Sequence, residues 1–233
     1  MIRAALVAVV ATFASVAETA PAAAQAASIG SVERVVVWGY GTPPGAGARD
    51  LFERSPVVQD EVVETPRDGA VHLRFNDDTR FRVGSLSKAT LDRFVFDPGR
   101  GGGELTIELS KGAFRFISGR MDKRAYVLVT PTATIGIRGT DFIVEVLESG
   151  ETVLTVLEGE VTLRTRLPPL REIDVAIGET GRLPADGSDP SKGRRGALGN
   201  PVGDPGLRDD GGRGGQEGGG GSGGGMGGSG GRN

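Results

Sequence analysis

The chain of 233 residues contains no cysteine, one histidine and one tryptophan. Without cysteine it can form no disulfide and carry no lipoprotein anchor, so packing alone must stabilise its fold. With a single histidine, His72, a metal site would need several carboxylates as further ligands. A Ser-His-Asp triad would also have to use His72, and no G-x-S-x-G motif occurs.

Two other patterns could bind an ion or a phosphate, and neither has the required spacing. Asp77 and Asp78, with Glu64 or Asp68, could hold a calcium ion weakly, but EF-hand and RTX spacings are absent and a solvated turn is favoured. The glycine-rich run at 99–103 is followed by neither a lysine nor a predicted helix, so it indicates a hairpin loop. We therefore predict no enzymatic activity, no cofactor and no metal.

Long apolar runs are absent except at the amino terminus. A short, positively charged segment that ends at Arg3 precedes an uncharged apolar stretch at 4–17. The residues AQA at 24–26 resemble a signal-peptidase cleavage site. The stretch is too short and wrongly flanked for a stable membrane span. We predict a cleavable signal peptide over residues 1–26, a periplasmic or extracellular location, and no transmembrane segment in the mature chain.

The carboxyl-terminal part has almost no apolar residues. Of its last 23 residues, 15 are glycine, and such a segment cannot bury enough surface to offset its ordering entropy. We predict that residues 184–233 are disordered and dispensable for folding. A terminus without a specific function is favoured over a flexible tether. One domain remains over residues 27–183. It carries the whole net charge of −3, which excludes a nucleic-acid partner.

The core shows the alternating pattern of short strands throughout. Apolar and polar residues alternate at 71–75, a turn follows at 76–78, and the alternation resumes at 79–83. Residues 85–94 are the best candidate for a helix. We predict an all-β fold, an irregular β-roll or solenoid-like sandwich of many short strands. The side chains expected to be buried are Val71, Leu73, Phe75, Phe81, Leu105, Ile107, Phe114, Phe116, Phe142, Val144 and Val161.

The most distinctive segment is TPTATIGIRGTDF at 130–142. Gly136 and Gly139 predict a sharp turn and a close approach to another strand. Arg138 lies between them, so we expect it to be held away from solvent, paired with Asp141 or a facing glutamate, and architectural in role. The predicted structural motif comprises Thr130, Pro131, Gly136, Arg138, Gly139, Thr140 and Asp141.

Two surfaces are candidates for binding. A basic cluster around the turn at 118–122 could meet an acidic protein or an anionic polysaccharide, although a charged tip that blocks strand aggregation is favoured. Trp38 and Tyr40 could form an exposed aromatic contact, but a lone tryptophan beside an apolar strand is more often packed in the core. The basic cluster consists of Arg115, Arg120, Lys123 and Arg124.

Several motifs together resemble the FecR-type periplasmic domain of bacteria. They are DEVVET at 60–65, FNDDT at 75–79, LDRFVFDP at 91–98, KGAFRF at 111–116, TPTATIGIRGT at 130–140 and LEGEV at 157–161. The resemblance covers roughly residues 29–183 and implies the fold and an envelope location. The family's best-known members are transmembrane regulators with an anti-sigma segment, one membrane helix, this β-domain and a module that senses an outer-membrane iron transporter.

The resemblance leaves three classes of function to compare. Our first hypothesis is a stand-alone, exported interaction or scaffold module whose partner is an envelope protein or an anionic polysaccharide. The second is a periplasmic sensing or regulatory component of cell-surface signalling, linked to an anti-sigma and sigma-factor system. The third, an enzyme, would require a deep cleft lined by carboxylates with perturbed pKa values.

Overall fold

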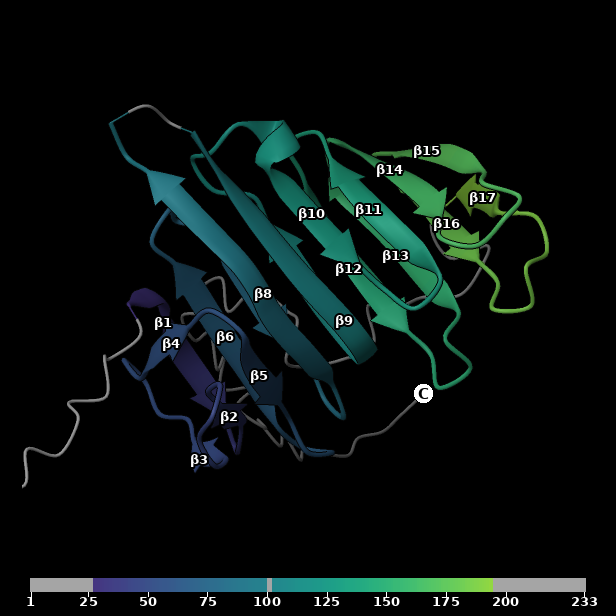
Figure 1. The fold of residues 1–233 in the computed structure, drawn as a ribbon. Coiled ribbons are helices and arrows are strands. Elements are labelled where there is room, and N and C mark those ends of the chain that lie inside the picture. The colour runs from purple at the N-terminus through teal and green to yellow at the C-terminus, as the bar shows by residue number, and fades with distance from the viewer. Residues whose placement is uncertain (1–26, 100–101, 195–233) are drawn as a thin grey trace, which may run out of the picture.

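The computed structural model describes residues 27–99 and 102–194, which form 17 strands and one short 3-10 helix, η1 (Figure 1). The predicted all-β fold is confirmed. The described residues contain no helix with the length and hydropathy that a membrane span requires. The elements are β1 Ser28–Val36, β2 Tyr40–Thr42, β3 Arg49–Asp50, β4 Pro56–Val58, β5 Glu61–Glu64, β6 Ala70–Phe75, β7 Arg80–Val83, β8 Lys88–Asp97, β9 Gly102–Ile117, η1 Lys123–Ala125, β10 Tyr126–Val129, β11 Ala133–Ile137, β12 Asp141–Val146, β13 Thr152–Glu158, β14 Glu160–Thr165, β15 Glu172–Ala176, β16 Glu179–Leu183 and β17 Ser191–Arg194.

The strands form two layers that share β9. Layer A has the order β4-β1-β6-β7-β9-β12-β13-β16-β17. Layer B has the order β3-β2-β5-β8-β9-β10-β11-β14-β15. Neighbouring strands are antiparallel, except that β10 runs parallel to β9. Short hairpins alternate between the layers along the chain, which gives the predicted roll-like sandwich.

β9 changes layers at Gly112. Its first part pairs with β8 and β10, and its last part, from Gly112 on, pairs with β7 and β12. Gly112 has a φ of +101°, which a residue with a side chain rarely adopts. A Cβ at this position would lie 2.1 Å from Ser87 Oγ and 2.5 Å from Ser87 Cα. The bend therefore requires glycine for its backbone angle and for its packing.

Inward-facing side chains of both layers form one core. Phe116 of layer A meets the ring of Tyr126 of layer B edge-on, with centroids 5.6 Å apart. Phe75 and Phe94 stack across the layers at 5.5 Å. Every side chain that the sequence predicts to be buried is at most 2% exposed, so that prediction is confirmed. Period-two alternation thus identifies the inner face of each layer.

Three expectations from the sequence are wrong in this part of the molecule. The helix candidate at 85–94 is mostly β8, whose alternating burial and pairing with β5 and β9 are those of a strand. The disorder predicted from Pro184 does not apply to 184–194, because β17 pairs with β16. Trp38 is 53% exposed, since it follows a sharp turn in which its N–H binds the Val36 carbonyl. The rest of the predicted tail and the predicted signal peptide lie outside the described residues.

Replacing Gly112 with alanine should lower the free energy of unfolding by roughly 2–4 kcal/mol. A left-handed backbone angle costs a residue with a Cβ about 1–3 kcal/mol, and overpacking against Ser87 costs a similar amount. Urea unfolding measures the loss. Gly102→Ala on the same strand is the control, because no atom lies within 4 Å of a Cβ there. Equal losses in the two variants would contradict the role assigned to the bend.

Candidate ligand-binding groove

A groove with a volume of about 350 Å³ lies on the outer face of layer B, over β10, β11, β14 and β15. Its floor consists of Val127, Thr134, Gly136 and Thr162. Gly136 is opposite Val127 on one side and Thr162 on the other. Because Gly136 has no side chain, the backbone of β11 is uncovered at the middle of this floor.

The fold itself does not require glycine at position 136. A Cβ there would have its nearest neighbours, two atoms of Thr162, at 3.9 Å, and the backbone angle is not left-handed. The close approach predicted at Gly136 is therefore wrong. It occurs instead at Gly139, which has a φ of +80° and whose carbonyl oxygen would lie 2.0 Å from a Cβ on Gly159. The predicted sharp turn is confirmed at Gly139, where the chain passes from β11 in layer B to β12 in layer A.

Three arginines and one glutamate line the rim of the groove. Arg164 donates two hydrogen bonds, at 2.8 and 2.6 Å, to one oxygen of Glu172, so this end of the groove is neutral. At the other end, Arg138 Nη1 lies 3.6 Å from Glu160 Oε1, which is too far for a hydrogen bond. The Arg124 guanidinium makes no ion pair or hydrogen bond with any described residue. Glu160 offsets the charge of only one of the two arginines, so a net positive charge remains at the end formed by Arg124 and Arg138.

Arg138 is exposed, contrary to expectation. Its side chain is 61% exposed, whereas the neighbouring Ile137 is buried at 3%. The reason is strand alternation, which turns Ile137 into the core and Arg138 outward. Its nearest carboxylate is the facing Glu160, one of the two kinds of partner expected. The architectural role of Arg138 stays a prediction, with a smaller cost than a buried ion pair would carry.

The buried ion pair is formed by Arg115 and Asp141 instead. Arg115 Nε and Nη2 donate to the two oxygens of Asp141 at 2.9 and 2.6 Å. The two side chains are only 8% and 15% exposed and join β9 to β12. Arg115 therefore does not belong to the exposed basic cluster predicted from the sequence.

The remaining members of that cluster point to different places. Arg120 binds Asp78 at 2.7 Å and lies over the ring of Phe96 at 5.6 Å. The alkyl chain of Lys123 packs near Gly139, with Cε 3.0 Å from where a Cβ would lie. Arg124 alone reaches the groove. The predicted single surface is thus divided.

The start of the distinctive motif is a turn held by threonines. The hydroxyls of Thr130 and Thr132 both form hydrogen bonds with Thr152 Oγ1, at 2.7 and 2.8 Å. Thr130 is buried and Pro131 is exposed. Thr140, at the other end of the motif, is also buried, and its backbone N–H binds Ser118 Oγ at 3.2 Å. These contacts fix the two ends of β11, and therefore the position of the groove floor.

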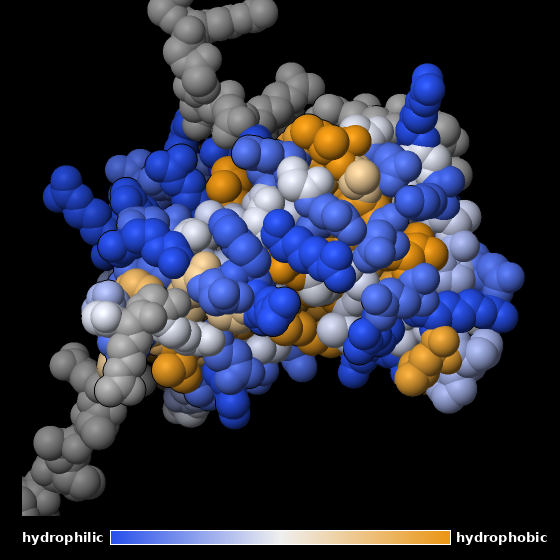
Figure 2. Space-filling model, turned by 90° about the horizontal axis from the view of Figure 1, so that it is seen from above, coloured by the Kyte–Doolittle hydropathy of each residue, from blue (hydrophilic) through white to orange (hydrophobic). Residues whose placement is uncertain are grey.

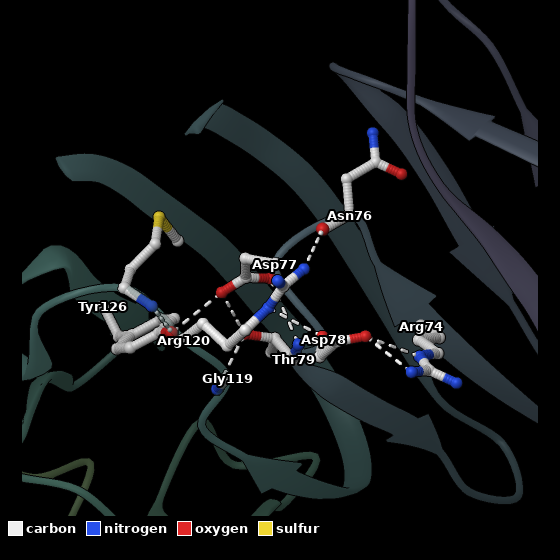
Figure 3. Close-up of polar contacts among 9 residues, drawn as sticks. Arg74, Asn76, Asp77, Asp78, Thr79, Gly119, Arg120 and Tyr126 are labelled. Carbon is white, nitrogen blue, oxygen red and sulfur yellow. Dashed lines mark hydrogen bonds and ion pairs between the residues drawn. The ribbon is translucent and has the colours of Figure 1, made fainter. Parts of the chain in front are cut away.

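A buried carboxylate fixes the loop that leads into the groove (Figure 3). Asp77 is fully buried and accepts hydrogen bonds from Thr79 Oγ1 at 2.7 Å and from the Tyr126 hydroxyl at 2.8 Å. Its carbonyl accepts from the N–H of Arg120 at 2.9 Å. Gly119 permits this contact, since a Cβ there would lie 2.3 Å from the Asp77 carbonyl. The hairpin turn of β6 and β7 thus holds the loop between β9 and β10.

Tyr126 connects this loop to the rim of the groove. Its hydroxyl also accepts a hydrogen bond from the Met121 N–H at 3.0 Å. Burial, together with the nearby Asp77 carboxylate, raises the pKa of Tyr126 to about 12. Tyr126 begins β10 directly after η1, whose cap Asp122 accepts from the Arg124 N–H at 2.9 Å. The backbone that carries Arg124 is therefore fixed from both sides.

Of the other carboxylates considered from the sequence, Asp78 and Glu64 are paired with basic side chains, Glu64 with Lys88 at 3.2 Å. Asp78 accepts from Arg74 at 3.0 and 2.6 Å and pairs with Arg120. His72 is 6% exposed on the outer face of layer A. Within the described residues there is no group of three or more His, Cys, Asp or Glu side chains that could hold a metal. The solvated turn expected at 77–78 is wrong for Asp77, because the loop between β9 and β10 covers it.

Glu61 is a further buried carboxylate, and it lies on β5, away from the strands of the groove. Burial raises the pKa of Glu61, while the Val58 N–H at 3.0 Å and Arg49 at 2.7 Å oppose the shift. Both carboxylate oxygens of Glu61 therefore have hydrogen-bond partners within the protein. The geometry is that of a structural ion pair.

Sequence reasoning missed five residues that line the groove: Tyr126, Val127, Thr162, Arg164 and Glu172. The alternation of β14 marks Thr162 and Arg164 as outward-facing. Their position in the same groove as Arg124 could not be read from the sequence. It results from the pairing of β11 with β14 in the folded chain.

Residues 61–162 match the family described as FecR protein. Two crystal structures of a candidate anti-sigma factor from Parabacteroides distasonis, at 1.65 and 2.50 Å resolution, are similar in fold, with TM-scores of 0.45 and 0.46 and 14% sequence identity. Each match covers 57% of this chain and 59% of that one. The chain thus spans less than two thirds of that protein's length. No curated protein matches the sequence closely.

Alanine at position 115 should lower the free energy of unfolding by about 3–5 kcal/mol, because it leaves the Asp141 carboxylate buried without its bidentate partner. Arg138→Ala is the matched comparison and should cost at most about 1 kcal/mol, since its ion pair is exposed. Urea unfolding of both variants measures the difference. A larger loss at position 138 than at position 115 would contradict the burial described here.

Tyr126→Phe should lower the free energy of unfolding by about 1–3 kcal/mol at neutral pH, because Asp77 and the Met121 N–H each lose a buried partner. The pKa of Tyr126 is raised in the folded state, so its stabilising effect is complete below about pH 10 and is lost as the pH rises through about 12. The stability gap between the two proteins should therefore narrow across this range. Urea unfolding at a series of alkaline pH values tests this, and a constant gap would contradict it.

Proposed function

We infer from the chain's membership of the FecR family, through residues 61–162, that it is a regulatory component of bacterial cell-surface signalling. In this proposal it acts in the envelope by binding a partner protein and catalyses no reaction. The family match is the observation that carries the proposal. It runs from β5 into β14 and contains all the residues that line the groove except Arg164 and Glu172.

Family membership favours regulation over the scaffold role that the sequence suggests first. The family's best-known members are regulators in which this β-domain stands between a membrane helix and a sensing module. A domain in that position transmits a binding event to another protein. A general scaffold role requires only an exposed surface, and it stays a wider alternative.

The ionisable groups of the groove support binding more than catalysis. Acid–base chemistry needs a pair of groups whose surroundings shift their pKa values toward the working pH. The carboxylate in the lining, Glu172, is neutralised by two hydrogen bonds from Arg164. The raised pKa of Glu61 belongs to an ion pair on β5.

The proposed location is the periplasm. The apolar stretch at 4–17 with its small residues at 24–26 supports export. The absence of cysteine is common in bacterial envelope proteins, which can dispense with disulfides when one core of this size is available. Partners in this compartment would be the periplasmic parts of membrane proteins.

Deleting the gene for this chain in its host should change the transcript levels of a limited set of genes that share one alternative sigma factor. Transcript sequencing of the deletion strain measures this, and the full chain supplied from a plasmid should restore the pattern. A chain without residues 1–26 should fail to restore it, because it would stay inside the cell. Unchanged transcripts together with a weakened envelope would favour the scaffold role and overturn the regulatory one.

A further inference from the structure

We propose that the groove on layer B binds a carboxylate of a peptide segment in the partner protein, between Arg124 and Arg138 and over the backbone of Gly136. The proposal deepens the proposed function, because it names the chemistry by which that partner would be held. Three observations carry it: the charge of the rim, the glycine of the floor and the shape of the lining.

The rim is positively charged at one end only. Arg124 has no ion pair with a described residue, and Arg138 is 3.6 Å from its nearest carboxylate oxygen. A guanidinium offers planar pairs of N–H donors that match the two oxygens of a carboxylate. The Arg164–Glu172 pair closes the opposite end without net charge. A ligand with one carboxylate at the Arg124 end therefore fits the charge distribution.

Glycine at position 136 has no structural explanation within the fold. A glycine inside a strand weakens the strand, and it commonly marks a close approach by another backbone or by a ligand. Here no other backbone comes closer than ordinary contact distance, because the atoms nearest to a Cβ are the Cβ and the carbonyl oxygen of Thr162, both at 3.9 Å. The uncovered backbone faces the groove. A ligand that lies against β11 would account for the glycine.

The lining favours a peptide over a polysaccharide. Sugars are commonly bound by exposed aromatic faces, but the ring in this lining, that of Tyr126, is only 1% exposed. The floor instead offers the hydroxyl of Thr134, which can donate to and accept from a peptide backbone, and that of Thr162, which donates to Asp174 Oδ1 at 2.7 Å and can still accept. Arg164 is opposite Thr134, which lies four residues before Arg138 along the chain. The two ends of the groove are therefore about 13 Å apart, a distance that an extended segment of four residues spans.

The surface next to the groove also favours recognition by polar groups. Figure 2 shows the end of the molecule that carries η1, where hydrophilic residues dominate and hydrophobic residues lie in separate patches. Stable binding through a large apolar contact would need a contiguous patch. A partner that approaches from this end would meet charged side chains first, Arg124 of η1 among them.

Three synthetic heptapeptides test the proposal by nuclear magnetic resonance titration of the purified full chain. The first, GSGEGSG, is blocked at both ends and presents an internal carboxylate. The second, GSGSGSG, has a free carboxyl terminus, and the third, GSGQGSG, is blocked and neutral. We expect one of the two acidic peptides to shift the amide signals of Gly136 and Thr162, which identifies the source of the carboxylate. The neutral peptide should shift neither signal.

Variants locate the binding to the groove. Arg124→Ala and Arg138→Ala should each weaken binding about tenfold or more, because each removes hydrogen bonds to a charged group. Gly136→Val should abolish binding while the protein still folds, because the space above the floor admits a side chain. Arg93→Ala is the matched control. Its side chain is 57% exposed and paired with Glu104 outside the groove, and its removal should leave binding unchanged.

Three results would overturn the proposal: no binding of either acidic peptide in the millimolar range, an equal loss of binding in Arg93→Ala, or binding of polygalacturonate without binding of the peptides. These outcomes are separate from a failure of the proposed function. If the transcript pattern depends on the chain but is fully restored by the Arg124→Ala, Arg138→Ala double variant, the regulatory role stands and the groove is not its site.

Discussion

The bend of β9 at Gly112 is the constraint on which the rest of the structure depends. A single strand pairs with β8 and β10 in one layer and with β7 and β12 in the other, so each layer is centred on it. Its two parts can lie in opposite layers only if the backbone turns sharply between them. The left-handed angle at Gly112 and the absence of a Cβ beside Ser87 make this turn possible. The common core of the two layers follows from that geometry.

The same bend determines where the groove can form. Because β9 ends in layer A while β10 lies beside its first part in layer B, the loop between them must cross the end of the sandwich. The crossing would leave the Asp77 carboxylate buried without partners if Tyr126 and Thr79 did not donate to it. That network fixes the start of β10 and with it the backbone of Arg124. A buried polar network in one layer thus positions an exposed cation on the outer face of the other.

Local patterns in the sequence identify the strands and the core, because period-two alternation marks one face of a strand wherever that face is buried. The same alternation, applied to Ile137, would have placed Arg138 outward, but its flanking glycines suggested close packing. β17 could not be predicted, since its residues SKGR do not alternate and are ordered by pairing with β16. The groove could not be predicted either. Arg124 and Arg164 are brought together by strand pairings that no local pattern encodes.

The central place of β9 also has a consequence for the order of folding. Two of its neighbours, β7 and β8, precede it in the chain, and the other two, β10 and β12, follow it. Pairings between distant segments, such as β1 with β6 and β13 with β16, add further loop closures. Topologies rich in such non-local pairings have a high contact order and fold in milliseconds to seconds. Since each layer needs strands from both sides of β9, neither half of the chain is a folding unit on its own. Synthesis must pass β10 before the centre of layer B can close, and β12 before the centre of layer A can close.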